Sequence, residues 1–206
     1  NKELGYLNNK LVSRTDYYYF SSGKIKTLAN YKNDNKNGQY TDWFENGQIK
    51  RDLNFKNDKE DGKFSTWYED GQIRQEKYYK NGKLNGKATL WYETGQMKAL
   101  GNYKDAKEHG QFTFWHETGQ KKSEKNYKNA KLNGKLTYWY ENGQMDTEEN
   151  FKDGKKNGKE YWWSENGKLN AIMNYKDGKE DGMQIWWHIN GVFKGYITHE
   201  AKWKDG

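Results

Sequence analysis

The sequence predicts an all-β protein: an elongated, single antiparallel β-meander of eight 24-residue β-hairpin repeats, twisted or curled along its length. The first observation is glycine at a constant interval of 24 residues, at positions 38, 62, 86, 110, 134, 158, 182 and 206. A second glycine follows nine residues after each of the first seven, from Gly47 to Gly191. The third is the aromatic stretch before each of these glycines, as expected for strands joined by tight turns.

The same interval divides the chain into repeats. Counting back 24 residues from Gly38 gives Arg14, and Gly23 again lies nine residues later. The repeats are therefore 14–37, 38–61, 62–85, 86–109, 110–133, 134–157, 158–181 and 182–206, and residues 1–13 form an N-terminal leader or cap. The repeat domain is 14–206.

Most repeats have Glu-Asn-Gly, Glu-Asp-Gly or Glu-Thr-Gly at the middle, and the first has Ser21-Ser22-Gly23 instead. These residues predict which turn closes the hairpin. A two-residue type I′ turn needs positive φ at both central positions, which β-branched Thr94 and Thr118 resist. A three-residue loop, a type I turn followed by a left-handed glycine with a bulge, asks this of the glycine alone. We therefore expect the three-residue loop here and another tight turn at the second connection, Lys-Asn-Gly-Lys or Lys-Asp-Gly-Lys.

This loop sets a register in which Trp43 stands opposite Ile49, and alternation then predicts Leu53 and Phe55 on the same face. The equivalent set in the next repeat is Trp67, Ile73 and Tyr79. Because a tryptophan recurs at positions 43, 67, 91, 115, 139, 163 and 187, we expect these side chains to form the packed core by stacking repeat on repeat. The alternative is a ladder of exposed platforms on which sugars stack.

Composition excludes several classes of function. Only 32% of the residues are hydrophobic, but 17% are aromatic, which argues against a disordered chain. There is no cysteine, and the four histidines have no metal-ligand spacing, so neither a metal nor a cofactor is expected. No apolar run reaches the roughly 20 residues that cross a bilayer. Localisation stays open, because a chain that begins at Asn1 is compatible with export and with truncation.

The repeated pattern, as in WYEDGQIRQEKYYKNGKLNG at 67–86, resembles the bacterial MORN repeat variant, the form also found in YwqK-type antitoxin proteins. The resemblance extends over the chain from Arg14 onward. It implies a scaffold that binds a toxin or other effector protein and neutralises it by occlusion. The rhythm of Trp-Tyr and Gly-Gln-Met is also similar to choline-binding repeats, which keeps a cell-surface glycan-binding or adhesion module as an alternative.

Aromatic residues vary from repeat to repeat on the strand face opposite the tryptophans. They are Tyr68, Tyr92, Phe114, Tyr138, Tyr140, Trp162 and Trp186, whereas Asp42, Thr66, Ser164 and His188 are the non-aromatic residues of this set. Exposed tyrosine and tryptophan are typical of protein–protein hot spots, so these aromatics are the candidate binding residues. The alternative is a second packing layer, formed by a curled sheet or covered by residues 1–13.

Charge is arranged by edge. Glutamates recur at the first turn, and lysines recur at the second: Lys56, Lys80, Lys104, Lys128, Lys152 and Lys176, each followed three residues later by another lysine. With a formal net charge of +7, this basic edge could bind anionic lipid or nucleic acid, or be a solvated edge neutralised by nearby acidic residues. Catalysis is not expected, because an active site is usually unique and these polar motifs recur throughout the chain.

Overall fold

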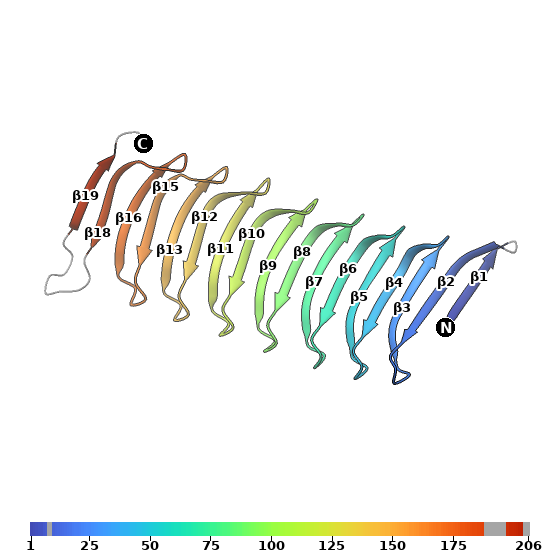
Figure 1. Cartoon of the computed structure of the whole chain (residues 1–206). Coiled ribbons are helices and arrows are strands. Elements are labelled where there is room, and N and C mark those ends of the chain that lie inside the picture. Colours follow the sequence, from blue (N-terminus) through green and yellow to red (C-terminus); the bar gives the residue numbers. More distant parts are fainter. Residues whose placement is uncertain (8–9, 188–196, 204–206) are drawn as a thin grey trace. The chain divides into compact units, whose positions relative to one another are not determined.

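The computed structural model describes residues 1–7, 10–187 and 197–203, and Figure 1 shows the strands in sequence order. The chain divides into two compact bodies. The first comprises Asn1–Met97 with Asn102–Lys107, and the second comprises Lys98–Gly101 with Glu108–Gly206. A search of the described residues for a helix long and apolar enough to cross a membrane finds none.

All the regular structure of the described residues is β-strand. The strands up to residue 104 are β1 (Lys2–Leu7), β2 (Lys10–Tyr19), β3 (Ile25–Lys32), β4 (Asn35–Trp43), β5 (Ile49–Lys56), β6 (Lys59–Trp67), β7 (Ile73–Lys80), β8 (Lys83–Trp91) and β9 (Met97–Lys104). They are followed by β10 (Lys107–Trp115), β11 (Lys121–Lys128), β12 (Lys131–Trp139), β13 (Met145–Lys152), β14 (Lys155–Lys156), β15 (Gly158–Trp163), β16 (Leu169–Lys176), β17 (Lys179–Glu180), β18 (Gly182–Trp187) and β19 (Ile197–Trp203). The prediction of an all-β, open antiparallel meander of hairpin repeats is confirmed.

In the seven repeats from 14–37 to 158–181, the first turn is the predicted three-residue loop. The backbone N–H of Phe44 donates to the carbonyl oxygen of Gln48 at 2.8 Å, and that of Gly47 donates to the carbonyl oxygen of Phe44 at 3.0 Å. Gly47 has a φ of +93°. In a later repeat Gly95 has a φ of +82°, while Thr94 is not among the described residues with positive φ. Positive φ therefore falls on the glycine alone.

The second turn is a two-residue type I′ turn, because both central residues have positive φ: +50° at Asn57 and +62° at Asp58. These turns are also hydrogen-bonded to the preceding repeat. The N–H of Gly82 donates to the carbonyl oxygen of Glu60 at 2.8 Å, and that of Ala106 donates to Leu84 at the same distance. The second turns thus hold neighbouring hairpins together as well as closing them.

The bulge beside the first turn changes which residues share a face. Trp43 pairs with Ile49 as predicted, but Asp42 pairs with Arg51, so Lys50 is an extra residue on β5. An extra residue reverses the alternation along the strand. Leu53 and Phe55 consequently pair with Tyr40 and Gly38, on the face away from Trp43.

The prediction that Leu53 and Phe55 share the face of Trp43 is therefore wrong, and the same holds one repeat later. There Tyr79 pairs with Gly62, and its ring packs edge-on against Phe64 with centroids 5.8 Å apart, on the face away from Trp67. We call the two faces the Trp face and the core face, the latter carrying Leu53 and its equivalents.

The buried apolar residues lie on the core face. They are Ala29, Leu53, Ala88, Phe112, Leu136 and Ala171, each at most 6% exposed. The seven recurrent tryptophans are only half-buried, so the prediction that they form the core is wrong. The physical reason is their place at strand ends, on a face whose middle is polar: the Thr41 hydroxyl there donates to Asp52 at 2.8 Å.

The leader lies within the sheet. Its residues 2–7 form β1, which pairs antiparallel with β2, with Lys2 opposite Asp16. Residues 1–13, where the structure describes them, therefore extend the first body by an edge strand and do not lie over the core face.

Candidate binding face

Four of the predicted binding residues lie in one row on the core face of the second body. Phe114, Tyr138, Trp162 and Trp186 alternate across neighbouring strands with Ser123, Thr147 and Ala171. Each ring is thus separated from the next by one strand carrying a small residue. Because neighbouring strands are about 4.8 Å apart, successive rings stand roughly 10 Å apart. We call the space between two successive rings a ring interval.

The three ring intervals differ. In the first, the ammonium of Lys125 lies 5.4 Å from the centroid of Phe114 and 5.7 Å from that of Tyr138. Ser123 beneath it is 4% exposed, and Ala171 beneath the third interval is 2% exposed. Thr147, beneath the second interval, is only half-buried. Trp162, which borders both the second and the third intervals, is 44% exposed, and the half-buried Thr147 makes the second interval the more open of the two.

The other three predicted residues, Tyr68, Tyr92 and Tyr140, directly follow a tryptophan and lie in the row beside the first turns. The Tyr68 hydroxyl donates to the carbonyl oxygen of Trp91 at 2.8 Å, and the Tyr140 hydroxyl donates to that of Trp163 at 2.9 Å. Tyr92 is half-buried at the equivalent position. The hydrogen bonds give Tyr68 and Tyr140 a structural part in joining successive repeats.

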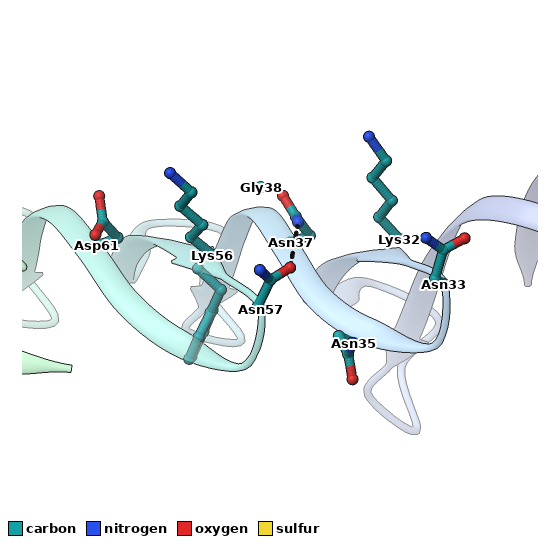
Figure 2. A pocket seen from close by; sticks show the side chains of 9 residues that line it. Lys32, Asn33, Asn35, Asn37, Gly38, Lys56, Asn57 and Asp61 are labelled. Carbon is teal, nitrogen blue, oxygen red and sulfur yellow. Dashed lines mark hydrogen bonds between the residues drawn. The ribbon is translucent and has the colours of Figure 1, made fainter. Parts of the chain in front are cut away.

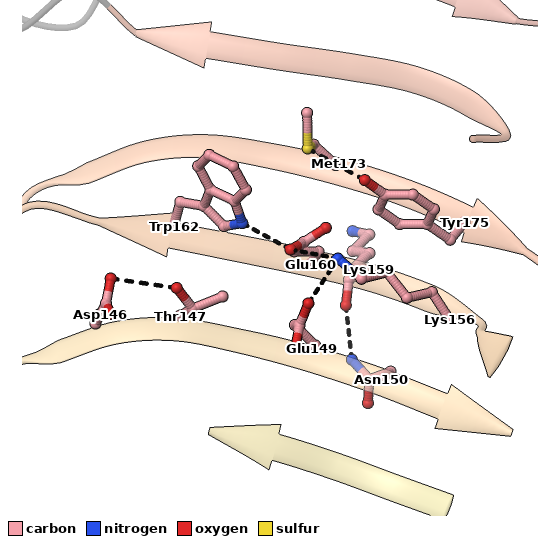
Figure 3. A network of polar contacts seen from close by, with 10 residues as sticks. All are labelled: Asp146, Thr147, Glu149, Asn150, Lys156, Lys159, Glu160, Trp162, Met173 and Tyr175. Atoms are coloured by element: carbon pink, nitrogen blue, oxygen red, sulfur yellow. Dashed lines mark hydrogen bonds and ion pairs between the residues drawn. The ribbon is translucent and has the colours of Figure 1, made fainter. Parts of the chain in front are cut away.

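A polar cluster lies beside the second ring interval, shown in Figure 3. The ammonium of Lys156 contacts Glu149 at 2.6 Å and Glu160 at 2.8 Å. The indole N–H of Trp162 donates to the same Glu160 oxygen, Oε1, at 2.7 Å. The residue Glu160 is only 2% exposed, and its second oxygen, Oε2, has no hydrogen-bond partner. Two carboxylates therefore share one lysine on the core face.

The pKa values of the cluster reflect this crowding. Burial raises the pKa of Glu149, and the neighbouring Glu160 raises it further against the opposing effect of Lys156. Burial would raise the pKa of Glu160 as well, but its hydrogen bonds from Lys156 and Trp162 outweigh burial and lower it. Burial and the charge of Glu160 raise the pKa of Tyr175 to about 12. Glu149 is thus the more readily protonated of the two carboxylates.

The sequence prediction missed Lys125, Glu149, Lys156 and Glu160. A signal was present, because this repeat position is charged in three repeats, at Lys77, Lys125 and Glu149, and small or apolar in the others, at Ala29, Leu53, Gly101 and Met173. A charged residue at an otherwise small or apolar position of a repeat is informative. It was not recognised because the prediction ignored the bulge and so assigned this position to the Trp face.

The first body has different chemistry on its core face. At the position of the ring row it carries Asp42, whose carboxylate accepts a hydrogen bond from Arg51 at 2.9 Å. Beside its first turns, cations lie over aromatic rings: Lys50 is 5.3 Å from the centroid of Phe44, and Arg74 is 5.8 Å from that of Tyr68. The row of four rings is thus a property of the second body.

The lysines of the predicted basic edge lie at the second turns, as expected. Lys80, Lys104, Lys128, Lys152 and Lys176 are all exposed, and Lys80 pairs directly with Lys83 across its turn. A polar pocket of about 580 Å³ lies at this edge of the first body, and its lining residues are drawn in Figure 2. Lys32 and Lys56 line it from two successive turns, together with Asp61.

The chain matches a known family of repeats. The family model described as the MORN repeat variant matches residues 17–33, 36–57, 60–81, 84–105, 108–129, 132–153 and 156–177. No curated protein gives a significant match to the chain. The segments from residue 36 onward begin and end at the second turns, so each of them covers one hairpin, whereas 17–33 begins within β2.

Proposed function

Because the chain belongs to the MORN repeat variant family, we propose that it is a non-enzymatic scaffold that binds a partner protein through the core face of its second body. The observation that carries the proposal is the row of Phe114, Tyr138, Trp162 and Trp186. Large aromatic side chains with partial exposure are the commonest hot spots of protein interfaces.

The distribution of the rings supports a binding role over a purely structural one. The equivalent residues earlier in the chain are Tyr18, Asp42, Thr66 and Leu90, so three consecutive repeats have no aromatic ring here. The hairpins of Asp42 and Thr66 have the same register as those of Phe114 and Tyr138. The hairpin therefore folds without an aromatic ring at this position. Aromatic residues gathered in consecutive repeats of a regular array are the kind of variation by which repeat proteins gain specificity.

The similarity of the repeats to YwqK-type antitoxins supports a narrower form of the proposal. The partner would be a toxin or other effector protein, neutralised when the scaffold covers its working surface. Occlusion requires only a stable, broad contact, so it suits a sheet face without a catalytic arrangement. A cell-surface glycan-binding module is the alternative from a different class.

A second candidate function is binding of anionic lipid or nucleic acid at the basic edge. The specific observation in its favour is like charge placed directly opposite like charge: Lys56 with Lys59, Lys80 with Lys83 and Lys128 with Lys131. Such cross-strand pairs are destabilising, and a bound polyanion would relieve them. Asp58, Glu60 and Asp61 at the same edge reduce the net positive charge.

The two functions are distinguished by variants of the whole chain used to capture a partner. We expect Tyr138→Ala and Trp162→Ala each to weaken partner binding by about 2 kcal/mol, with little dependence on salt. Tyr78→Ala is the matched control, because Tyr78 is 40% exposed on the Trp face. Loss of binding in the Lys104→Glu, Lys128→Glu double variant, with both aromatic truncations still binding, would instead establish the polyanion function.

A further inference from the structure

Two successive ring intervals of the second body differ at one repeat position. Lys125 and Glu149 are 24 residues apart and occupy equivalent places in their repeats. Leu136 lies on the strand between them and pairs with both Lys125 and Glu149. Lys125 places its ammonium between two rings. Where the first interval contains a cation of the protein itself, the second has a carboxylate beside it.

The first interval shows what the spacing of the rings accommodates. An ammonium within about 6 Å of an aromatic centroid is attracted by the negative face of the ring. Lys125 satisfies this distance to Phe114 and Tyr138 together, at 5.4 and 5.7 Å. Two rings separated by one intervening strand are therefore far enough apart to admit a cationic group. They are also near enough for both rings to contact it.

The charges around the second interval favour a cation. Glu149 and Asp146 both raise the pKa of Tyr138, after the larger effect of burial, and Lys156 opposes them. Glu160 is the third carboxylate and is bonded to the Trp162 indole. Around this interval, the carboxylates of Glu149, Asp146 and Glu160 thus outnumber the ammonium groups of Lys156 and Lys125.

We propose that the interval between Tyr138 and Trp162 binds a cationic side chain of the partner, a lysine ammonium or an arginine guanidinium. The two rings contact the cation from either side, as Phe114 and Tyr138 contact Lys125, and Glu149 supplies the compensating charge. This inference rests on the proposed function and specifies the chemistry that the partner presents to this face.

The third interval does not share this property. The residue equivalent to Lys125 and Glu149 is Met173 there, and Ala171 beneath the rings is 2% exposed. Thr147 is half-buried, so the second interval is open where the third is covered. A cationic group therefore fits the second interval alone of the three.

The experiment titrates the whole chain with Nα-acetyl-lysine amide and, separately, Nα-acetyl-arginine amide. Binding is followed by the indole N–H resonance of Trp162, which is assigned by its loss in Trp162→Phe. Nα-acetyl-norleucine amide is the uncharged control of the same shape, and sodium chloride controls for ionic strength. We expect a saturable shift with one or both cationic probes and none with either control.

Two variants locate the site. Glu149→Gln should weaken probe binding by about fivefold, a loss of ~1 kcal/mol of charge interaction. Glu148→Gln is the matched control, since Glu148 pairs with Lys135 on the Trp face at 2.9 Å. Glu149→Lys should abolish binding, because the chain then fills the interval itself as Lys125 does. Thermal unfolding of both Glu149 variants checks that the hairpins are intact.

Two outcomes would overturn the inference: no saturable shift with either cationic probe, or an equal shift with the norleucine amide. Neither would affect the scaffold proposal, which depends on whether Tyr138→Ala and Trp162→Ala lose the captured partner. Conversely, cation binding in a chain whose aromatic truncations keep their partner would separate the site from the interface.

Discussion

The Tyr68 hydroxyl donates a 2.8 Å hydrogen bond to the backbone carbonyl oxygen of Trp91, in the next repeat. Tyr140 and Trp163 repeat this relationship at 2.9 Å, and the imidazole Nε2 of His116 lies 3.1 Å from the carbonyl oxygen of Trp139. In these three repeats, the residue after the tryptophan thus ties its hairpin to the following one. Stability along the array depends on such ties, because a single hairpin has little interior of its own.

Tyr68→Phe and Tyr140→Phe remove this hydrogen bond and keep the ring. We expect each to lower the free energy of unfolding by about 0.5–1.5 kcal/mol, as measured by urea denaturation. Tyr6→Phe is the control, because Tyr6 is 61% exposed on the edge strand. If the three variants unfold alike, the hydrogen bonds contribute nothing to coupling between repeats.

Leu53→Ala and Ile49→Ala test the assignment of the two faces. Leu53 is 2% exposed on the core face, whereas Ile49, beside Trp43, is 41% exposed. Truncating the buried side chain should cost about 2–5 kcal/mol of unfolding free energy, and truncating the exposed one much less. Equal losses of unfolding free energy in urea denaturation would contradict this assignment and would mean that Leu53 and Ile49 are packed to the same extent.

Ala106→Gly and Ala130→Gly should stabilise the protein. Both alanines occupy the second position of a type I′ turn, with φ of +64° and +61°. A Cβ atom is unfavourable in that region by about 1 kcal/mol, so glycine should raise the thermal midpoint. Gly82→Ala, at the same position of another turn with a φ of +76°, should lower it by a similar free energy. The two alanine-to-glycine variants and Gly82→Ala should therefore change the thermal midpoint in opposite directions.

Gly95→Ala should destabilise the protein mainly through its backbone conformation, because the atom nearest the new Cβ is the end of a flexible glutamine side chain that can move. A Cβ at Gly95 would require a φ of +82° and would lie 2.9 Å from the side-chain oxygen of Gln72 in the preceding repeat. We expect a loss of more than about 1 kcal/mol in thermal or urea unfolding. Thr94→Asn should be neutral or stabilising, because Asn46 at the equivalent place accepts a hydrogen bond from the N–H of Gln48 at 2.9 Å.

Stability should fall as the pH rises from 10 toward 12, in part through Tyr175. Its pKa is raised from 10.0 to about 12, mainly by burial and by the charge of Glu160. A group with a raised pKa in the folded state stabilises fully below its unfolded pKa and loses that contribution as pH rises through the folded value. Tyr175→Phe should therefore lose less unfolding free energy over this range than the parent chain. An unchanged slope would contradict the raised pKa.

The turns were predicted correctly because they depend on local chemistry. Thr94 resists positive φ wherever it stands in the chain, so the choice of loop could be made from its type alone. The pairing of Trp43 with Ile49 followed directly from that loop. The rule of alternation was then applied across the bulge without the reversal that an extra residue introduces, and Leu53 was assigned to the wrong face.

The candidate site could be predicted only in part. Phe114, Tyr138, Trp162 and Trp186 stand out in the sequence as irregular aromatic residues on a regular array, and the structure places them in one row. Tyr68 and Tyr140 looked the same in sequence, but their hydroxyl groups bond to the backbone of the next repeat. Sequence alone does not distinguish an aromatic residue of the ring row from one whose hydroxyl donates a hydrogen bond to the backbone of the next repeat.

The sequence by itself determined the repeat, its two kinds of turn and the antiparallel meander, because glycine spacing and backbone sterics act within a few residues of one another. Only the tertiary structure decided which face is buried and that Lys125 and Glu149 mark neighbouring ring intervals. Both depend on register across several strands, where one bulge residue reverses every side chain that follows it.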